Sequence, residues 1–412
     1  MKWVLRIGSG LLGAVLVFVI VLAGWWAAAT QLGWRDMPAG PAPARSEVYD
    51  PRFDAAGEAA VAALERMRGA HGVPGATAAV SLDGELVWAG AVGWSDLEAE
   101  TPMTPDAIMR IGSTSKAMTS TVLARLADAG ALAITDTVAD HAAPLNPDWG
   151  PLQLYRLMSH TAGFPGYEEN TDFPDSIDTL RMRGSYASVE QGLSLVDESA
   201  MLHGHGAAYH YSSFDVNVAA WTAVEATQTS FPDLLRASIR EPLNLETPLP
   251  GDHGAPHPDQ SVFYEIRGGD QVRVWPRTDV SQRWPGGGLV SRSRDLVVIA
   301  GAWLKDDFIA PDTRALFWTP VTLNDGSVNP ENYAIGWRVG VNTTRFGEDR
   351  PTPWAHHGGV SRGAMSWLVV YPDLGLSVAV NINTNTAEFG DFASAEPEIT
   401  RAFAEAAGRA PG

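Results

Sequence analysis

Two pairs of β-rich segments, one near each end of the chain, constrain the fold most strongly. Residues 76–82 and 85–93 are joined by Asp83-Gly84, the dipeptide that best supplies the positive φ angles of a two-residue hairpin turn. Residues 365–371 and 376–383 flank a Pro-Asp-Leu-Gly turn in the same manner. Both ends of the chain are therefore predicted to form antiparallel hairpins.

Helical patterns accompany both hairpins. Residues 55–70 place Val61, Leu64 and Met67 at three-residue steps, and residues 396–407 also read as a helix. Residues 117 to about 280 are mostly helical patches and loops, without the regular strand–helix alternation of a parallel sheet. We expect an α+β fold, in which an antiparallel β-sheet is flanked by the N- and C-terminal helices and carries an inserted, mostly helical region.

Composition limits the chemistry. The 412 residues are 45% hydrophobic and 19% charged, which is typical of a packed globular chain. The net charge of −19 opposes attraction to phosphates, so we expect no nucleic-acid partner. The absence of cysteine excludes disulfides, thiolate metal sites and a cysteine nucleophile.

The N-terminal segment has the character of a membrane span. After Lys2 and Arg6 the chain is uncharged for 23 residues, Ile7–Ala29, which would reach about 35 Å as a helix. The length and Trp25-Trp26 favour a retained anchor, while the alanines at 27–29 also suit signal-peptide cleavage. Either alternative exports the rest of the chain.

We therefore divide the chain into three parts. Residues 1–30 are expected to be a transmembrane anchor or signal segment, and residues 31–47 a Pro/Ala-rich linker. Residues 48–412 are expected to form one domain on the extracytoplasmic (periplasmic) side, either membrane-anchored or secreted.

The first chemical signal is Ser113-Thr114-Ser115-Lys116, followed by a helical pattern over residues 117–127. Residues three apart share a helix face, so the Lys116 amine would lie one turn from the Ser113 hydroxyl. An amine in a poorly solvated pocket has a lowered pKa and accepts a proton near neutral pH. Serine beside such a base is an activated nucleophile. A capping serine beside a solvated lysine is the structural alternative.

Lysine is rare in this chain, which weighs against that alternative. The sequence holds three lysines against 26 arginines, and only lysine supplies a compact, deprotonable amine.

Two weaker signals follow. Tyr209–Ser213 contains Tyr211, whose phenol could relay a proton if it met Ser113 in space. His356–Gly359 joins imidazoles to glycines that let backbone N–H groups approach a substrate. Alone, these would suit a buried tyrosine and a polar loop before an edge strand.

In this order the three elements resemble the serine β-lactamase and penicillin-binding-protein-like hydrolases, in the branch related to class C β-lactamases. Ser113–Lys116 matches Ser-x-x-Lys, Tyr211–Ser213 falls on Tyr-x-Asn, and His356–Gly358 falls on Lys-Thr-Gly, which is often His-x-Gly in this branch. The resemblance covers about residues 55–405, and residues 283–288 with 318–320 look most like the mitochondrial β-lactamase-like serine protease subgroup. Further landmarks are Gly72–Gly75, Arg110–Gly112, Leu157–Gly163, Gly286–Ser291 with Asp295, and Tyr371–Asp373.

The resemblance implies acyl transfer. Ser113 would attack a carbonyl, and Lys116 and Tyr211 would share the roles of general base and acid. The N–H groups of Ser113 and Gly359 would hold the oxyanion, with Gly358 beside them. His356 would anchor the substrate or polarise Tyr211.

Two departures from the family pattern concern the substrate. Ser213 stands where asparagine is usual, and a serine hydroxyl is shorter than the amide that a β-lactam or D-alanyl substrate would meet. His203-Gly204-His205 stands where Pro-Gly is more usual. We predict an exported, membrane-tethered hydrolase of an ester or amide, acting on a small-molecule or peptide acyl substrate. The alternatives are a D-alanyl carboxypeptidase or β-lactamase, and an idle binding or envelope protein.

No cofactor is expected. Half of the ten histidines lie at 203, 205, 210, 356 and 357, but glycines make the first of these segments a loop and no carboxylate falls at ligand spacing. We expect no metal site, and a structural role for His160. The loops at 164–200 and 246–282 carry no readable chemistry, so the acyl and leaving groups stay open.

Overall fold

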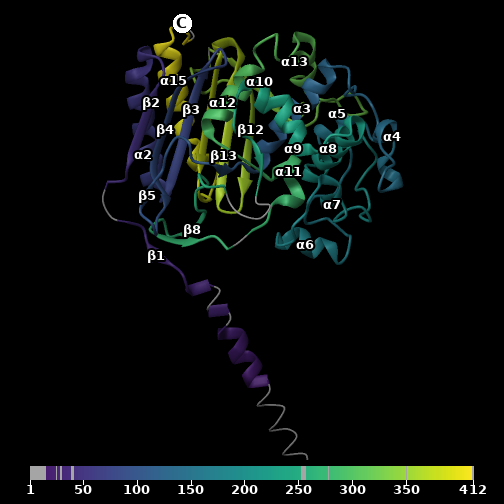
Figure 1. Ribbon diagram of the computed structural model, residues 1–412, viewed down its shortest axis with the longest axis horizontal. Helices are drawn as coiled ribbons and strands as arrows, with labels where there is room; N and C mark the ends of the chain where they lie inside the picture. The colour runs from purple at the N-terminus through teal and green to yellow at the C-terminus, as the bar shows by residue number, and fades with distance from the viewer. Residues whose placement is uncertain are drawn as a thin grey trace, which may run out of the picture.

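An antiparallel sheet forms the centre of the molecule, in the strand order β11-β12-β13-β14-β3-β4-β2 (Figure 1). The computed structural model describes residues 15–24, 26–27, 30–38, 41–251, 257–276, 278–348 and 350–410. The strands of this sheet are β2 (Ala44–Val48), β3 (Gly75–Leu82), β4 (Glu85–Asp96), β11 (Arg338–Asn342), β12 (Thr352–Ser361), β13 (Ala364–Tyr371) and β14 (Leu376–Ile382), with β5 (Thr101–Pro102) paired to β4.

Both predicted hairpins are present. Asp83 and Gly84 have φ angles of 52° and 79°, as the two-residue turn between β3 and β4 requires. β14 pairs with β3, so the two ends of the chain meet in the middle of the sheet. The α+β class is confirmed.

One face of the sheet is covered by the terminal helices α2 (Asp54–His71), α14 (Phe389–Ala393) and α15 (Ala395–Ala406). Alternate strand residues such as Val80 and Val380 enter this core, because successive side chains of a strand point to opposite faces. Phe53 and Phe403 stack here with their ring centroids 5.3 Å apart. The sequence prediction of two flanking helices is therefore correct.

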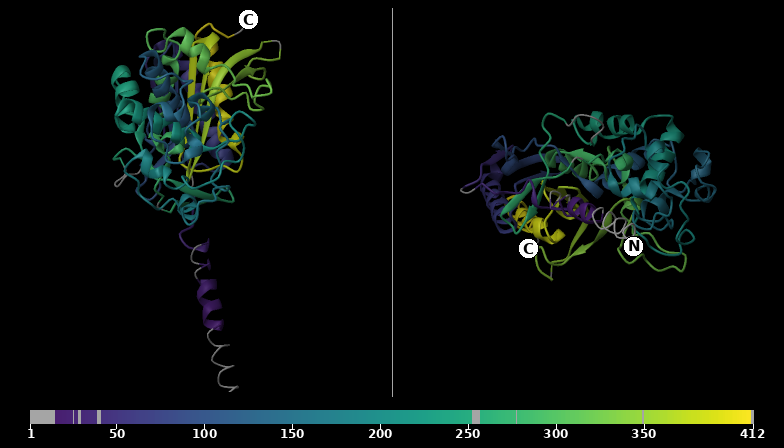
Figure 2. Two further views of the ribbon diagram at one scale, coloured as in Figure 1. Left: turned by 90° about the vertical axis from the view of Figure 1, so that its right-hand side faces the viewer. Right: turned by 90° about the horizontal axis from the view of Figure 1, so that it is seen from below.

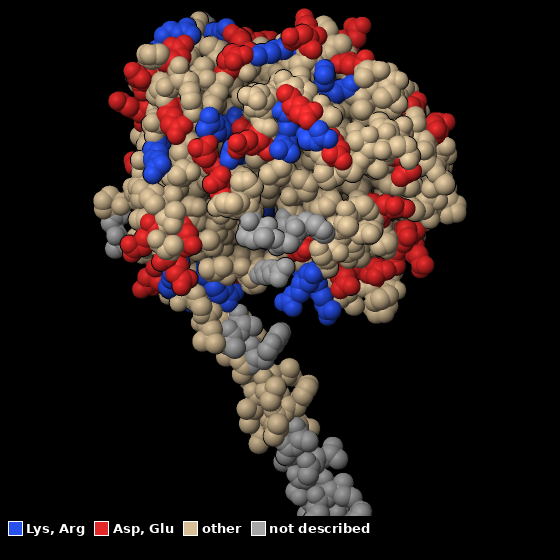
Figure 3. All heavy atoms as spheres, in the orientation of Figure 1, with Lys and Arg blue, Asp and Glu red and all other residues tan. Residues whose placement is uncertain are grey.

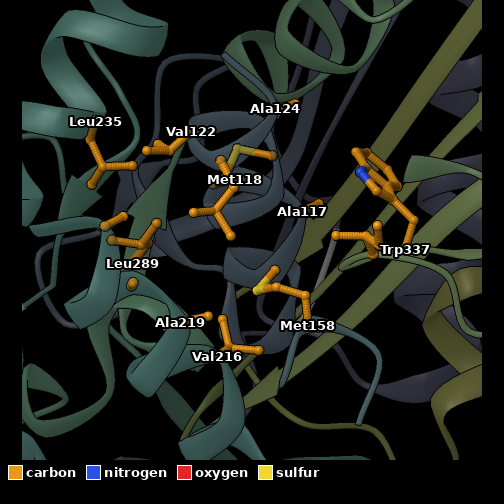
Figure 4. Packing of buried hydrophobic residues seen from close by; sticks show 14 of the residues in the cluster. Ala117, Met118, Val122, Ala124, Met158, Val216, Ala219, Leu235, Leu289 and Trp337 are labelled. Atoms are coloured by element: carbon orange, nitrogen blue, oxygen red, sulfur yellow. The ribbon is translucent and has the colours of Figure 1, made fainter. Parts of the chain in front are cut away.

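The other face packs against α12 (Ser293–Ala302) and a helical lobe, seen to the right of the sheet in Figure 1. At the centre of the lobe, the buried side chains of α3 (Ser115–Asp128) meet those of neighbouring helices, among them Met118, Val216 and Leu235 (Figure 4). The other lobe helices are α4 (Val138–His141), α5 (Leu154–Met158), α6 (Asp175–Arg181), α7 (Val189–Leu193), α8 (Ser213–Thr227), α9 (Phe231–Leu235), α10 (Glu241–Leu243), α11 (Trp284–Gly287) and α13 (Pro311–Phe317).

Two small sheets complete the fold. One joins β1 (Arg35–Asp36), β8 (Tyr264–Arg267) and β9 (Gln271–Val274), and the other joins β6 (Met109–Arg110), β7 (Leu249–Pro250) and β10 (Leu289–Ser291). The β8–β9 hairpin lies inside the region expected to be mostly helical. Its strands are four residues each, too short for a periodic signal.

The expected linker at 31–47 is partly wrong. β1 pairs with β9, and β2 pairs with β4 from Ala44 to Val48, so the sheet begins before Val48. β2 is an edge strand whose central residues are exposed and polar, and it therefore lacks the apolar alternation that identifies a strand in sequence.

The helix at residues 15–24 stands away from the body (Figure 2). Residues 1–14, 25, 28 and 29 of the expected 1–30 segment lie outside the described residues. Residues 15–24 are helical with exposed side chains. Within the described part of the chain, none of the helices combines the length and the apolar character that crossing a bilayer requires.

Candidate active site

Ser113 lies at the junction of the sheet and the helical lobe. It belongs to a 3₁₀ turn, Gly112–Thr114, that leads directly into α3, so the predicted position at the start of a helix is correct. Ser113 is half-buried and lines a cavity of ≈ 360 Å³. The hydroxyl is thus available to a substrate.

Lys116 is fully buried on the first turn of α3. Its Nζ lies 3.1 Å from Ser113 Oγ and 2.8 Å from Ser213 Oγ, and it also donates to the carbonyl of Gly286. Burial holds the pKa of Lys116 well below its usual value, and the charges of Arg283 and Arg338 lower it further. The amine is therefore suited to accept the Ser113 proton.

Tyr211 and Ser213 reach Lys116 from the start of α8. Ser212 is the N-cap: its hydroxyl accepts from Phe214 N–H at 3.1 Å and donates to the carbonyl of Pro165 at 2.7 Å. Lys116 Nζ lies 4.7 Å from the centroid of the Tyr211 ring. Burial raises the pKa of Tyr211, while a hydrogen bond with Ser113 opposes the shift. The structure thus brings together Ser113, Lys116, Tyr211 and Ser213.

The prediction for His356 is wrong. Its ring lies among aromatic side chains, 4.3 Å from Trp354 and 4.8 Å from Trp367 between centroids, and its buried Nδ1 has no partner among the described residues. The neighbour His357 faces the lobe instead, with Nε2 2.6 Å from the hydroxyl of Tyr333. Adjacent residues of β12 point to opposite faces, and the sequence does not say which imidazole faces Ser113.

The same alternation separates the two glycines of β12. A Cβ on Gly359 would lie 1.9 Å from the carbonyl oxygen of Ile111 and 2.8 Å from the backbone N of Thr114, so only glycine allows this approach beside the nucleophile. A Cβ on Gly358 would meet Phe389 on the far face, 2.3 Å from its Cζ. Gly359 therefore joins the site, and Gly358 does not face it.

The pairing of β12 with β13 bears on the N–H groups of Gly359 and Val360. A two-residue turn at 362–363 joins β12 to β13, so Ser361 and Ala364 form the closing hydrogen-bonded pair, and Gly359 with Ser366 forms the next one. This pattern directs the Gly359 N–H at β13 and the Val360 N–H away from it. A Cβ on Gly112 would lie 2.6 Å from Val360 N. The N–H that points away from the sheet on this cavity wall, which also includes Ser113, is therefore that of Val360.

Sequence reasoning missed a buried pair behind Tyr211. His160 Nδ1 lies 3.0 Å from Asp215 Oδ2, both side chains are fully buried, and the His160 ring lies 4.2 Å from that of Tyr211 between centroids. Burial raises the pKa of Asp215 and lowers that of His160, so a neutral acid donates to a neutral imidazole. His160 has the structural role expected for it, but its main partner is Asp215. Nothing in the spacing of the two residues indicates this.

Asp215→Asn and Asp215→Ala test that assignment. The asparagine amide still donates to Nδ1, so we expect a free energy of unfolding close to that of the wild type. The alanine leaves Nδ1 with only a long contact to Ser212 N–H at 3.4 Å, and should cost about 1–3 kcal/mol. Chemical denaturation of the two variants compares these values; equal losses for both would show that the carboxylate is ionised.

His356→Phe and His357→Phe test the correction. We expect kcat/KM within about threefold of the wild type for His356→Phe, and at least a tenfold loss for His357→Phe, which breaks the bond to Tyr333. Burial lowers the pKa of His356 to about 3, against 6.5 in the unfolded chain. Its contribution to stability is thus present above pH 6.5 and lost as the pH falls towards 3.

The pH dependence of stability provides a second test of the His356→Phe and His357→Phe variants. The loss in free energy of unfolding between pH 7 and pH 4.5 should be smaller for His356→Phe than for the wild type, by up to about 2 kcal/mol. A loss of activity in His356→Phe, with His357→Phe unaffected, would restore the original assignment.

No three His, Asp or Glu side chains of the described residues come together as a metal site. His203 Nδ1 lies 3.0 Å from the Gly204 carbonyl, and His210 lies 3.8 Å from Glu169. His203 and His210 thus contact groups of the protein other than a cluster of metal ligands.

Comparisons with known proteins agree with this geometry. The family model described as Beta-lactamase matches residues 60–397. The human serine beta-lactamase-like protein LACTB, mitochondrial, is 24% identical over an alignment that covers 75% of this chain and 71% of that protein. A D-aminopeptidase of Gluconobacter oxydans is 27% identical over an alignment that covers 81% of this chain and 60% of that protein. The structure of a D-amino acid amidase from Ochrobactrum anthropi superposes with a TM-score of 0.69 at 19% identity, over 85% of this chain and 99% of that one. The chain therefore belongs to the β-lactamase family and is a serine hydrolase.

Proposed function

We propose that this hydrolase cleaves an ester or amide through an acyl-enzyme on Ser113. The observation that carries the proposal is the contact of 3.1 Å between Ser113 Oγ and Lys116 Nζ, an amine whose pKa burial has lowered, at the edge of an open cavity. The amine takes the serine proton as the hydroxyl attacks the carbonyl. The N–H groups of Ser113 and Val360 receive the oxyanion, each for about 3 kcal/mol of transition-state stabilisation.

Tyr211 is the proton donor to the leaving group. Its raised pKa keeps the phenol protonated at neutral pH, and its contact with Ser113 brings the phenol next to the breaking bond. The ammonium formed on Lys116, 4.7 Å from the ring centroid, is the nearby source from which the phenol recovers its proton. Water then attacks the acyl-enzyme: Lys116 takes a proton from the water, Ser113 leaves with a proton from Tyr211, and Tyr211 recovers its proton from Lys116.

Ser213 favours small esters and amides over β-lactams and D-alanyl peptides. Its hydroxyl is occupied by Lys116 at 2.8 Å and offers no side-chain amide to a substrate. The D-aminopeptidase and the D-amino acid amidase among the relatives are named for substrates with amino or amide groups, in keeping with acyl transfer at nitrogen.

A labelling experiment tests the proposal. An activated phosphonate should modify Ser113 alone, as mapped by mass spectrometry, and p-nitrophenyl esters and p-nitroanilides should be turned over faster than a cephalosporin. Modification of a different serine would refute the assignment of the nucleophile. Stable labelling by penicillin would favour the D-alanyl peptidase or β-lactamase alternative.

We further propose that the body acts outside the cytoplasm, tethered by the N-terminal segment. The support is the uncharged sequence from Ile7 to Ala29, together with the exposed apolar side chains of the helix at 15–24, which stands clear of the body (Figure 2). To test this, the full chain and residues 31–412 are each expressed with a C-terminal reporter enzyme that is active only outside the cytoplasm. The proposal is supported if the full chain shows reporter activity and is found in the membrane fraction while residues 31–412 do neither. It is refuted if the full chain is found in the cytosol.

A further inference from the structure

Two arginines line the same cavity as Ser113 in a chain of strongly negative charge. Arg283 and Arg362 are both part of the cavity wall, whereas the chain carries a net charge of −19 and acidic side chains are spread over the face seen in Figure 3. Neither guanidinium forms an ion pair with an Asp or Glu of the described residues, and no carboxylate is among the groups that act on their pKa values. The cavity therefore concentrates positive charge that no Asp or Glu in the described part of the chain neutralises in an ion pair.

Arg283 is held in place by neutral groups. Its Nη2 donates to the Thr179 carbonyl at 3.0 Å, and its Cζ lies 4.0 Å from the centroid of the Tyr167 ring. Its Nε is shielded from solvent and has no hydrogen-bond partner among the described residues. Burial lowers the pKa of Arg283, which means that the folded protein holds this cation at a cost in free energy. An anionic ligand would offset that cost.

Arg362 is fixed on the turn between β12 and β13. Asn385 Nδ2 donates to the carbonyls of Ser361 at 2.9 Å and Ala364 at 3.2 Å, and its Oδ1 accepts from Gly363 N–H at 2.9 Å. The guanidinium donates to the carbonyls of Leu180 and Arg181. It therefore connects the β12–β13 turn to the end of α6.

The charges at this end of the cavity repel one another. After burial, the charges of Arg283, Arg183 and Arg110 lower the pKa of Arg362. Like charges are held together only where the fold or a ligand compensates for the repulsion, and a single carboxylate accepts bidentate hydrogen bonds from arginine.

The position of this cavity relative to the catalytic groups identifies the part of the substrate that it receives. Tyr211 protonates the leaving group in the proposed mechanism, so the leaving group lies on the Tyr211 side of Ser113. The cavity wall includes Ser113 and extends to Leu180 and Met182, but Tyr211 is not part of it. The acyl group therefore enters this cavity, and the apolar side chains suit a short methylene chain.

We propose that the acyl group of the substrate ends in a carboxylate bound by Arg283 and Arg362, so that the enzyme acts on monoamides or monoesters of dicarboxylic acids. This inference rests on the proposed hydrolysis through Ser113. It adds what that proposal leaves open, namely the charge of the acyl group.

Three p-nitroanilides of similar length test the proposal on the full chain: glutaric acid mono-p-nitroanilide, its methyl ester, and 5-aminopentanoyl p-nitroanilide. We expect kcat/KM for the anion to exceed that for the neutral ester at least tenfold, with the cation slowest. The preference should weaken as salt is raised from 0.05 M to 0.5 M, because salt screens the attraction. Equal rates for anion and neutral ester would overturn the proposal.

Arg362→Gln should lower the anion-to-neutral ratio of kcat/KM about tenfold, mainly through KM for the anion. Arg66→Gln is the matched control, since Arg66 is an exposed arginine paired with Glu398 on the terminal helices, and it should keep the wild-type ratio. Arg283→Lys keeps the positive charge and loses the planar guanidinium. Its anion-to-neutral ratio of kcat/KM should lie between those of Arg362→Gln and Arg66→Gln. A ratio unchanged in Arg362→Gln would refute the role of that residue even if the wild type prefers anions.

The outcomes separate this inference from the proposed function. If the neutral ester is turned over as fast as the anion, the proposed mechanism at Ser113 stands and the proposed carboxylate site is refuted. If Ser113→Ala still turns over these substrates, both the proposed mechanism and the proposed carboxylate site are refuted.

Discussion

Ser113→Ala is expected to lower kcat by at least about 10⁴-fold on every ester and amide that the wild type turns over, because removing the nucleophile removes the acyl-enzyme path. Lys116 keeps its hydrogen bonds to Ser213 and Gly286, so the buried amine stays satisfied and the variant should fold. The measurement is initial-rate hydrolysis of a p-nitroanilide, with a melting temperature recorded in parallel.

The control for Ser113→Ala is Ser194→Ala. Ser194 is exposed and donates to the Gln191 carbonyl on α7, away from the cavity, so its loss should leave kcat within about twofold and the phosphonate label on Ser113. A Ser113→Ala protein with more than a few per cent of wild-type activity would mean that another nucleophile works in this cleft.

Lys116→Met is expected to lower kcat by at least about 10³-fold while the fold is retained. Methionine has a similar length and no proton to exchange, so Ser113 keeps its place but loses its base. A serine attacks poorly without deprotonation, and Tyr211 cannot replace the base because burial raises its pKa. The rate should be measured from pH 6 to pH 10, since the wild type should follow deprotonation of Lys116 at a pH well below 10.5.

Stability provides an independent measure of the same lysine. Its pKa in the folded state is lowered from the 10.5 of the unfolded chain, so its contribution to stability is present above pH 10.5 and is lost as the pH falls through the lowered value. Lys116→Met should remove that pH dependence from the free energy of unfolding, measured at pH 7 and pH 9.5. An unchanged pH dependence would show that the lowered pKa belongs to a different group.

The absence of cysteine permits a rescue experiment. Lys116→Cys would carry the single thiol of the chain, and aminoethylation of the unfolded protein followed by refolding would restore an amine at nearly the lysine position. Recovery of at least tenfold in kcat, with no change in similarly treated wild type, would assign the effect to the amine. No recovery in a correctly refolded protein would contradict the role of Lys116 as the base.

The parts of the site that follow local rules were predictable. Ser113 and Lys116 are three residues apart at a helix start, and that spacing alone fixes their proximity. The Asp83-Gly84 turn and the two-residue period of β3, β4, β13 and β14 likewise act within a few residues. The proximity of Tyr211 to Ser113 was predicted only from the order of motifs in the family resemblance, because no local rule joins residues about a hundred positions apart.

Sequence patterns were sufficient for the α+β fold and for the proximity of Ser113 to Lys116, since helix and strand periods and turn chemistry act between near neighbours. Long-range packing was needed to show that His357 and not His356 faces Tyr333, that the Val360 N–H points away from β13, and that Asp215 lies behind Tyr211. A shift of one residue along β12 reverses the face on which a side chain lies, and the register of that strand is fixed by its pairing with β13 and by the lobe packed on it. The arginines at 283 and 362 meet for the same reason, because distant segments of the chain form the two walls of one cavity.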